Sequence, residues 1–252
     1  MSSTKIDRRT ALLGMGGSAL AVWPAIGTSQ PNANWHGFVV ETGTRGWPDY
    51  AVGVLVCADP PRRLSYLRTL RSQALFKPGK HGYLRPLRYS STDRHRMDFA
   101  RLAMRHFSQR PDMYISMVCA GTMHWPDTAI ARDAVQTQMY ERMLRQIRPT
   151  FRNHLKLHVI RRTRNGRDLA LLNTAKVSVG FVQSIDQAGH SNKDLMAVAS
   201  LIVGSINAEQ SRTITDASKL QLRSALRSYL QVATLRPALL NQTGKLRVLT
   251  LT

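Results

Sequence analysis

The stretch from Ser191 to Ile206, SNKDLMAVASLIVGSI, places the strongest constraint on the fold. Ser191 followed by Asp194 resembles a capping box at the start of a helix. Beyond Asp194 the predicted helix is apolar or small on every side. A helix of this kind in a globular protein is buried between other layers of structure. The chain therefore needs further elements on both sides of this helix.

Apolar runs and alternating patterns elsewhere predict the strands that supply a sheet. They cover residues 36–41, 51–57, 83–91 and 112–120. A further strand is predicted from His154, and it ends in a basic turn around Asn165-Gly166, a dipeptide typical of tight hairpins. The alternation of Val177, Val179 and Phe181 predicts one more strand after that turn.

Amphipathic helices are predicted between these strands and after them, over residues 60–75, 93–108, 127–148 and 215–232. The last of them is expected to close the domain. Helices interleaved with strands indicate an α/β layer architecture. A chain of 252 residues can form one such domain, which we expect from residue 35 to residue 252 after a polar linker at 27–34.

The amino terminus resembles a twin-arginine export signal over residues 1–26. Arg8 and Arg9 precede a weakly apolar run that is interrupted by glycines, and Ala19-Leu20-Ala21 offers a small-residue cleavage pattern. Asp7 departs from the usual signal, which has Ser or Thr there. The expected location is the periplasm, with the cytoplasm as the alternative, and no transmembrane helix is expected in the mature chain.

The charge balance points to an acidic partner. There are 36 Lys and Arg against 15 Asp and Glu, which gives a formal net charge of +21 spread along the whole chain. Such a protein attracts polyanions: nucleic acid, anionic lipid or acidic glycan. The alternative explanation of the high Arg content is a GC-rich genome, which favours Arg codons.

Cys57 and Cys119 lie in apolar runs, as free buried thiols do.

The order of elements and three motifs resemble the RNase H-like family known as domain of unknown function 3800. VETG at 40–43 is similar to the family's Asp-Glu-Ser-Gly on the first strand. PLRY at 86–89 stands where the family has an acidic-x-Lys motif, and LMAVASLIVG at 195–204 stands at its terminal helix. The resemblance implies an RNase H-like mixed sheet of about five to six strands flanked by helices.

The same resemblance implies that the metal site has been lost. RNase H-like nucleases cluster carboxylates around two divalent cations. Here Val40 replaces the leading Asp, Pro86 and Arg88 replace the acidic and Lys positions, and Ser200 replaces the last Asp. Glu41 remains, and family geometry brings Asp186 and Asp194 near it. These three are the weak candidates for a rearranged site, which would use Mg²⁺ or Mn²⁺.

A row of Arg side chains is the candidate nucleic-acid site. Four of them occur in the basic turn and three in the region of the third strand, and together they could follow a nucleic-acid backbone at the edge of the sheet. They are Arg88, Arg94, Arg96, Arg161, Arg162, Arg164 and Arg167. A solvated charged turn is the alternative interpretation of the basic cluster. Few aromatic residues accompany them, so the sequence does not indicate base stacking.

Three functions follow from these observations. The first is a basic, non-catalytic RNase H-like domain that binds nucleic acid or another polyanion. The second is a metal-dependent nuclease with Glu41, Asp186 and Asp194 as its site. The third is a scaffold subunit that binds an acidic protein partner.

Overall fold

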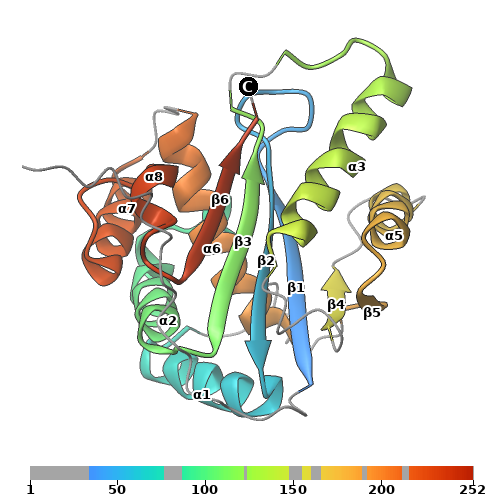
Figure 1. The fold of residues 1–252 in the computed structure, drawn as a ribbon. Helices are drawn as coiled ribbons and strands as arrows, with labels where there is room; N and C mark the ends of the chain where they lie inside the picture. The colour runs from blue at the N-terminus through green and yellow to red at the C-terminus, as the bar shows by residue number, and fades with distance from the viewer. Residues whose placement is uncertain are drawn as a thin grey trace, which may run out of the picture.

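Six strands form one mixed sheet in the computed structural model, which describes residues 34–76, 87–121, 124–147, 155–159, 166–188, 192–211 and 216–251 (Figure 1). The strands are β1 (Trp35–Thr42), β2 (Ala51–Ala58), β3 (Met113–Cys119), β4 (Leu155–Val159), β5 (Val182–Gln187) and β6 (Leu246–Thr250). Their order across the sheet is β5-β4-β1-β2-β3-β6. β2 is antiparallel to β1 and β3, and the other neighbouring pairs are parallel.

This topology is RNase H-like. β1, β2 and β3 form an antiparallel meander, and β4 and β5 continue the sheet in parallel on the other side of β1. The second and fourth strands therefore both flank the first. The expected α/β fold class, a mixed sheet of about five to six strands flanked by helices, is confirmed.

One face of the sheet is covered by α6 (Lys193–Gln210), which packs against β1 and β2. Around α6 lie α1 (Pro60–Gln73), α2 (Met97–Gln109) and α7 (Ala217–Leu230), so that α6 is enclosed between the sheet and other helices (Figure 1). Every residue of α6 from Asp194 to Ala208 is buried. The helix is apolar all round because it has no side that faces solvent.

The other face of the sheet is covered by α3 (Ala129–Arg145) and α5 (Arg167–Val179), which contact each other. Met139, Met143 and Leu144 of α3 and Leu172 of α5 are buried in the core on this side. Met139 and Met143 are four residues apart, as the sheet-facing stripe of a helix requires. None of the described helices, α6 included, is both long and apolar enough to cross a membrane.

The prediction of a hairpin turn at Asn165-Gly166 followed by a strand through Val177, Val179 and Phe181 is wrong for residues 166–181, and a strand, β5, begins only at Val182. Gly166 is the residue before α5, in a left-handed conformation with φ 68°, and the chain continues into a helix instead of a hairpin. The alternating Val177 and Val179 still belong to α5, and Val177 is 81% exposed. Leu172 and Ala175, three residues apart, carry the apolar contact of α5 with the core, and this helical spacing outweighs the short alternation.

The third predicted strand does not form in its described part. Residues 83–86 lie outside the described residues, and Tyr89–Ser91 form a single 3-10 turn, η1. A second 3-10 turn, η2, covers Arg94–Arg96 and leads into α2. Tyr89 packs directly over Gly204 of α6, where a Cβ would collide with the Tyr89 side chain. This close approach places η1 on the helix, away from the sheet.

The carboxyl-terminal segment adds an edge that the sequence did not indicate. α7 does not close the domain, because α8 (Pro237–Leu240) and β6 follow it, and β6 pairs with β3. Lys245, just before β6, connects this edge to the end of α2 and the start of β3. Its ammonium donates to the backbone carbonyls of Phe107 and Met113, at 3.2 Å each, and to that of Arg110.

Cys57 and Cys119 are buried free thiols, and burial raises the pKa of the Cys119 thiol to about 12.

Candidate functional site

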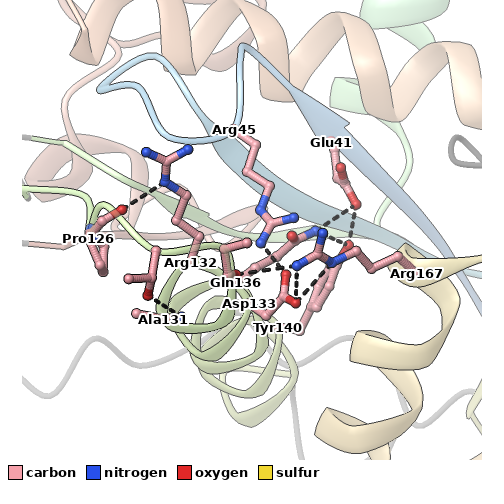
Figure 2. A network of polar contacts seen from close by, with 11 residues as sticks. Glu41, Arg45, Pro126, Ala131, Arg132, Asp133, Gln136, Tyr140 and Arg167 are labelled. Atoms are coloured by element: carbon pink, nitrogen blue, oxygen red, sulfur yellow. Dashed lines mark hydrogen bonds and ion pairs between the residues drawn. The ribbon is translucent and has the colours of Figure 1, made fainter.

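Glu41, the candidate that the sequence singled out, lies near the carboxyl end of β1 and is held by α3 (Figure 2). The Tyr140 hydroxyl donates a hydrogen bond to Glu41 Oε1, and Gln136 Nε2 contacts the same oxygen at 3.4 Å. Gln136 Nε2 also donates to the Tyr140 oxygen at 3.2 Å. Gln136 and Tyr140 are one helical turn apart, so both side chains reach the same carboxylate.

The Tyr140 hydroxyl is a hydrogen-bond donor to Glu41. Burial raises the pKa of Tyr140 well above its ordinary value, and the neighbouring charge of Glu41 and the hydrogen bond to it raise the pKa further. The hydroxyl therefore keeps its proton at any physiological pH. A carboxylate that is bound in this way by a phenol and an amide has fewer lone pairs left for a metal ion.

A second carboxylate of α3, Asp133, is bound by two arginines. Arg45, from the turn between β1 and β2, and Arg167, the first residue of α5, both form ion pairs with it (Figure 2). Burial alone would raise the pKa of Asp133, but the hydrogen bonds and charges of Arg167 and Arg45 outweigh it and hold the pKa below its usual range. Through these ion pairs Asp133 connects α3 to the turn between β1 and β2 and to the start of α5.

Asp168 is a third carboxylate in this region, and sequence reasoning missed it. It lies in the first turn of α5 and is buried, and its Oδ2 atom has no hydrogen-bond partner among the described residues. Its negative charge also contributes to the raised pKa of Tyr140. Asp168 was missed because the hairpin predicted at Asn165-Gly166 placed it at the end of a strand, whereas it lies in the first turn of a helix.

Asp194 lies in the layer on the opposite face of the sheet. Its buried carboxylate pairs with Arg71 of α1, and both side chains are only 7% exposed. Ser191 lies outside the described residues, and the residue before α6 is Asn192. Asp194 thus compensates a buried guanidinium on the α1 and α6 side, whereas Glu41 faces α3.

Asp186 has a third, separate environment. It is exposed on β5, lies beside His158 in the pairing of β4 with β5, and accepts a hydrogen bond from Ser184 at 3.3 Å. Across the described parts of the chain, no three His, Cys, Asp or Glu side chains lie close enough together to hold a metal ion. Glu41, Asp186 and Asp194 therefore do not form the shared site that family geometry suggested.

Two histidines meet between β1 and β4. His36 Nδ1 and His158 Nε2 are 2.7 Å apart, and the rings are parallel with centroids 5.0 Å apart. Burial lowers the pKa of both rings, the proximity of the two rings lowers that of His36 further, and Asp186 opposes the shift in each. His154 lies outside the described residues.

The candidate arginines are divided between the two faces. Arg88 and Arg94 are exposed on η1 and η2, in the layer of α6, and Arg96 is ion-paired with Asp93 at 3.7 Å. Arg167 lies with α3 on the opposite face and is held by Asp133. Arg161, Arg162 and Arg164 lie outside the described residues. Arg88 and Arg94 are therefore the part of the predicted row that the structure presents to solvent.

The chain matches no protein-family model, no curated protein and no solved structure. The RNase H-like topology consequently rests on the strand order and directions described above. Ser200 is buried and accepts a hydrogen bond from the Tyr89 amide at 3.4 Å. This position holds η1 against α6 in the present chain.

Proposed function

We propose that this chain is a strongly basic RNase H-like domain that binds nucleic acid, or a polyanion of similar charge density, without cleaving it. The observation that carries the proposal is the way the chain uses its carboxylates. Asp133 is bound by Arg45 and Arg167, and Glu41 is bound by Tyr140 and Gln136. Glu41, the candidate metal ligand on β1, is thus bound by the protein's own donors, and its neighbour Asp133 is neutralised by two arginines.

The surplus of positive charge supports the binding part of the proposal. Several carboxylates of the described chain are already paired with Arg or Lys: Asp93, Asp112, Asp133, Asp194, Glu209 and Asp216. With 36 basic and 15 acidic residues, these pairs leave a large excess of cations. Arg88 and Arg94 are exposed to solvent. Cationic surfaces of this kind bind phosphate backbones in a sequence-independent and salt-sensitive way.

The binding test measures affinity for labelled single-stranded and duplex oligonucleotides by fluorescence anisotropy at several salt concentrations. We expect the association constant to fall steeply between about 50 and 200 mM salt, because bound phosphates release counterions. Replacing Arg88 and Arg94 by Ser should lower the slope of log K against log salt by about 2, roughly 1 for each phosphate contact.

The matched control replaces Arg142 and Arg145 by Ser. These two arginines are exposed at the end of α3, so the variant loses the same charge from the opposite face of the sheet. An equal effect of the two double variants would assign binding to net charge alone and not to the η1 and η2 segment. An affinity that does not change with salt would overturn the proposal.

Nuclease activity is the outcome that contradicts the non-catalytic part. Wild type and Glu41→Gln should both leave DNA and RNA intact with Mg²⁺ or Mn²⁺ present. Metal-dependent cleavage by the wild type that disappears in Glu41→Gln would show a working site at β1.

Export remains part of the proposal. The twin-arginine-like segment at 1–26 lies outside the described residues, so its support is the sequence pattern alone. Fractionation of cells that produce the full chain should place a shortened protein in the periplasm. Recovery of the uncleaved chain from the cytoplasm would contradict this.

A further inference from the structure

Trp47 differs from the other tryptophans of the described chain. Trp35 and Trp125 are each only 6% exposed, whereas the Trp47 side chain, in the turn between β1 and β2, is 63% exposed. Indole is among the largest apolar surfaces that a side chain can offer. A single exposed apolar residue needs no explanation by itself, so the surroundings of Trp47 decide what it can do.

The backbone of Trp47 is held firmly while its ring stays in solvent. Its amide donates to the Thr44 carbonyl at 3.0 Å, and its own carbonyl accepts from the Tyr50 amide at 3.0 Å. The buried Trp125 adds a third restraint, because its indole nitrogen donates to the same carbonyl at 3.1 Å. Three hydrogen bonds thus fix the turn on which the exposed ring is carried.

Arg132, at the start of α3, lies against this turn. A Cβ built on Gly46 would be 3.8 Å from its guanidinium atoms. Its Nε atom donates to the Pro126 carbonyl at 2.7 Å, and its two terminal nitrogens point away from Asp133 (Figure 2). Asp133 is already occupied by Arg45 and Arg167. Arg132 is therefore a positioned cation that no carboxylate of the described chain neutralises.

An exposed ring on a rigid turn next to an oriented guanidinium matches the chemistry of an unpaired nucleotide. Bases of a single strand stack on aromatic side chains, and the neighbouring phosphate binds Arg. Bases inside a duplex keep their faces stacked on one another, so a lone indole gains little from a duplex. Thr44, Arg45 and Asp49, which belong to the same turn, are polar, whereas docking on a lipid surface requires a continuous apolar face.

We propose that the turn between β1 and β2 is a binding site for single-stranded nucleic acid, in which Trp47 stacks on a base and Arg132 binds an adjacent phosphate. This inference rests on the proposed function and names the form of nucleic acid that the domain selects. Within the turn, the Asp49 carboxylate accepts a hydrogen bond from the Thr44 amide at 3.4 Å.

The test compares the affinities of variants for single-stranded and duplex oligonucleotides of equal length at moderate salt. Trp47→Ala should weaken single-strand binding by about 10-fold and leave duplex binding unchanged. Trp47→Phe should retain most of the affinity, because a phenyl ring still stacks. Arg132→Gln should lower the salt slope by about 1. Val177→Ala, a change at an exposed apolar residue of α5, is the matched control and should have no effect.

Tryptophan fluorescence provides a second readout. Addition of a single-stranded oligonucleotide should quench the wild-type emission, and this quenching should be lost in Trp47→Ala. Salt-sensitive oligonucleotide binding by the wild type that Trp47→Ala leaves unchanged would overturn the inference and leave the proposed function standing. A wild type that binds no oligonucleotide even at low salt would overturn both. Trp47-dependent binding to vesicles of anionic lipid, without any effect on oligonucleotides, would assign the ring to a membrane surface and also overturn the inference.

Discussion

Glu41 and Asp194 lie in layers on opposite faces of the sheet, and their carboxylates are compensated in different ways. Glu41 is half-buried and accepts from the neutral donors Tyr140 and Gln136. Asp194 is buried and pairs with Arg71, whose guanidinium lies 4.6 Å from the ring centroid of Phe76 and 4.9 Å from that of Phe99. The deeper carboxylate has the charged partner, because a buried charge without a counter-charge is strongly unfavourable.

The comparison also shows why Glu41 and Asp194 do not share a metal site. Two carboxylates that share a cation must face the same space, and Glu41 and Asp194 face different layers. Each has become part of the packing around it. Four predictions test how much each kind of environment contributes to stability. They begin with the buried ion pair and end with an exposed side chain, in order of decreasing expected effect.

The largest effect is expected at Arg71. Arg71→Ala removes the only ion-pair partner that Asp194 has in the described chain, and it should lower the free energy of unfolding by about 3 to 5 kcal/mol. Urea unfolding followed by circular dichroism measures the change. The double variant Arg71→Met with Asp194→Leu should recover most of the loss, because no buried charge remains. A single variant as stable as wild type would show that the pair is solvated.

A smaller loss is expected for Tyr140→Phe, which removes the hydroxyl that donates to Glu41. Since the acceptor is charged, the free energy of unfolding should fall by about 2 kcal/mol. Tyr114→Phe is the control, because the Tyr114 hydroxyl donates to the neutral Gln146 carbonyl at 3.1 Å, and its loss should be about 1 kcal/mol. Equal losses in the two variants would argue that the hydrogen bond to Glu41 is no stronger than one to a neutral carbonyl.

Asp133→Asn should have a smaller effect that depends on pH. The pKa of Asp133 is lowered in the folded protein, so its charge stabilises the fold above the unfolded pKa near 3.9, and this contribution is lost as pH falls through the lower folded value. Near pH 7 the variant should be less stable by about 1 kcal/mol. Thermal unfolding at a series of pH values should show the gap to wild type closing below about pH 4. A gap that is constant down to pH 2 would indicate a packing defect.

The smallest effect on stability is expected for Trp47→Ala. Since the ring is largely exposed, the free energy of unfolding should change by less than about 0.5 kcal/mol. The measurement is urea unfolding of the same protein that is used for oligonucleotide binding. A loss above about 1 kcal/mol would mean that the ring packs against the domain in solution, and the binding result would then reflect folding.

Local patterns predicted much of the fold correctly. The segment after Ser191 could only be an enclosed helix, and α6 is enclosed. Residues 166–181 were misread because three alternating residues, Val177, Val179 and Phe181, outweighed the less obvious helical spacing of Leu172 and Ala175. β6 was missed because its place is at the sheet edge next to β3, far away in the sequence.

The candidate site was predicted less well for the same reason. Glu41 was found from a motif, but its partners Gln136 and Tyr140 lie 95 and 99 residues away along the chain. Asp168 and Trp47 belong to no recognisable motif. They stand out only in the structure, where Asp168 is buried and Trp47 is exposed. Asp133 was not considered because its two arginines come from other elements.

The amino-acid sequence alone determined the layered α/β class, the enclosed helix and the basic charge. These are properties of composition and local periodicity, which each segment carries by itself. Only the tertiary structure decided which side chains meet: Asp194 with Arg71 across 123 residues, and Glu41 with Tyr140 across 99. Such pairings depend on how complete elements pack, and packing is set by the sheet order and the layers around it.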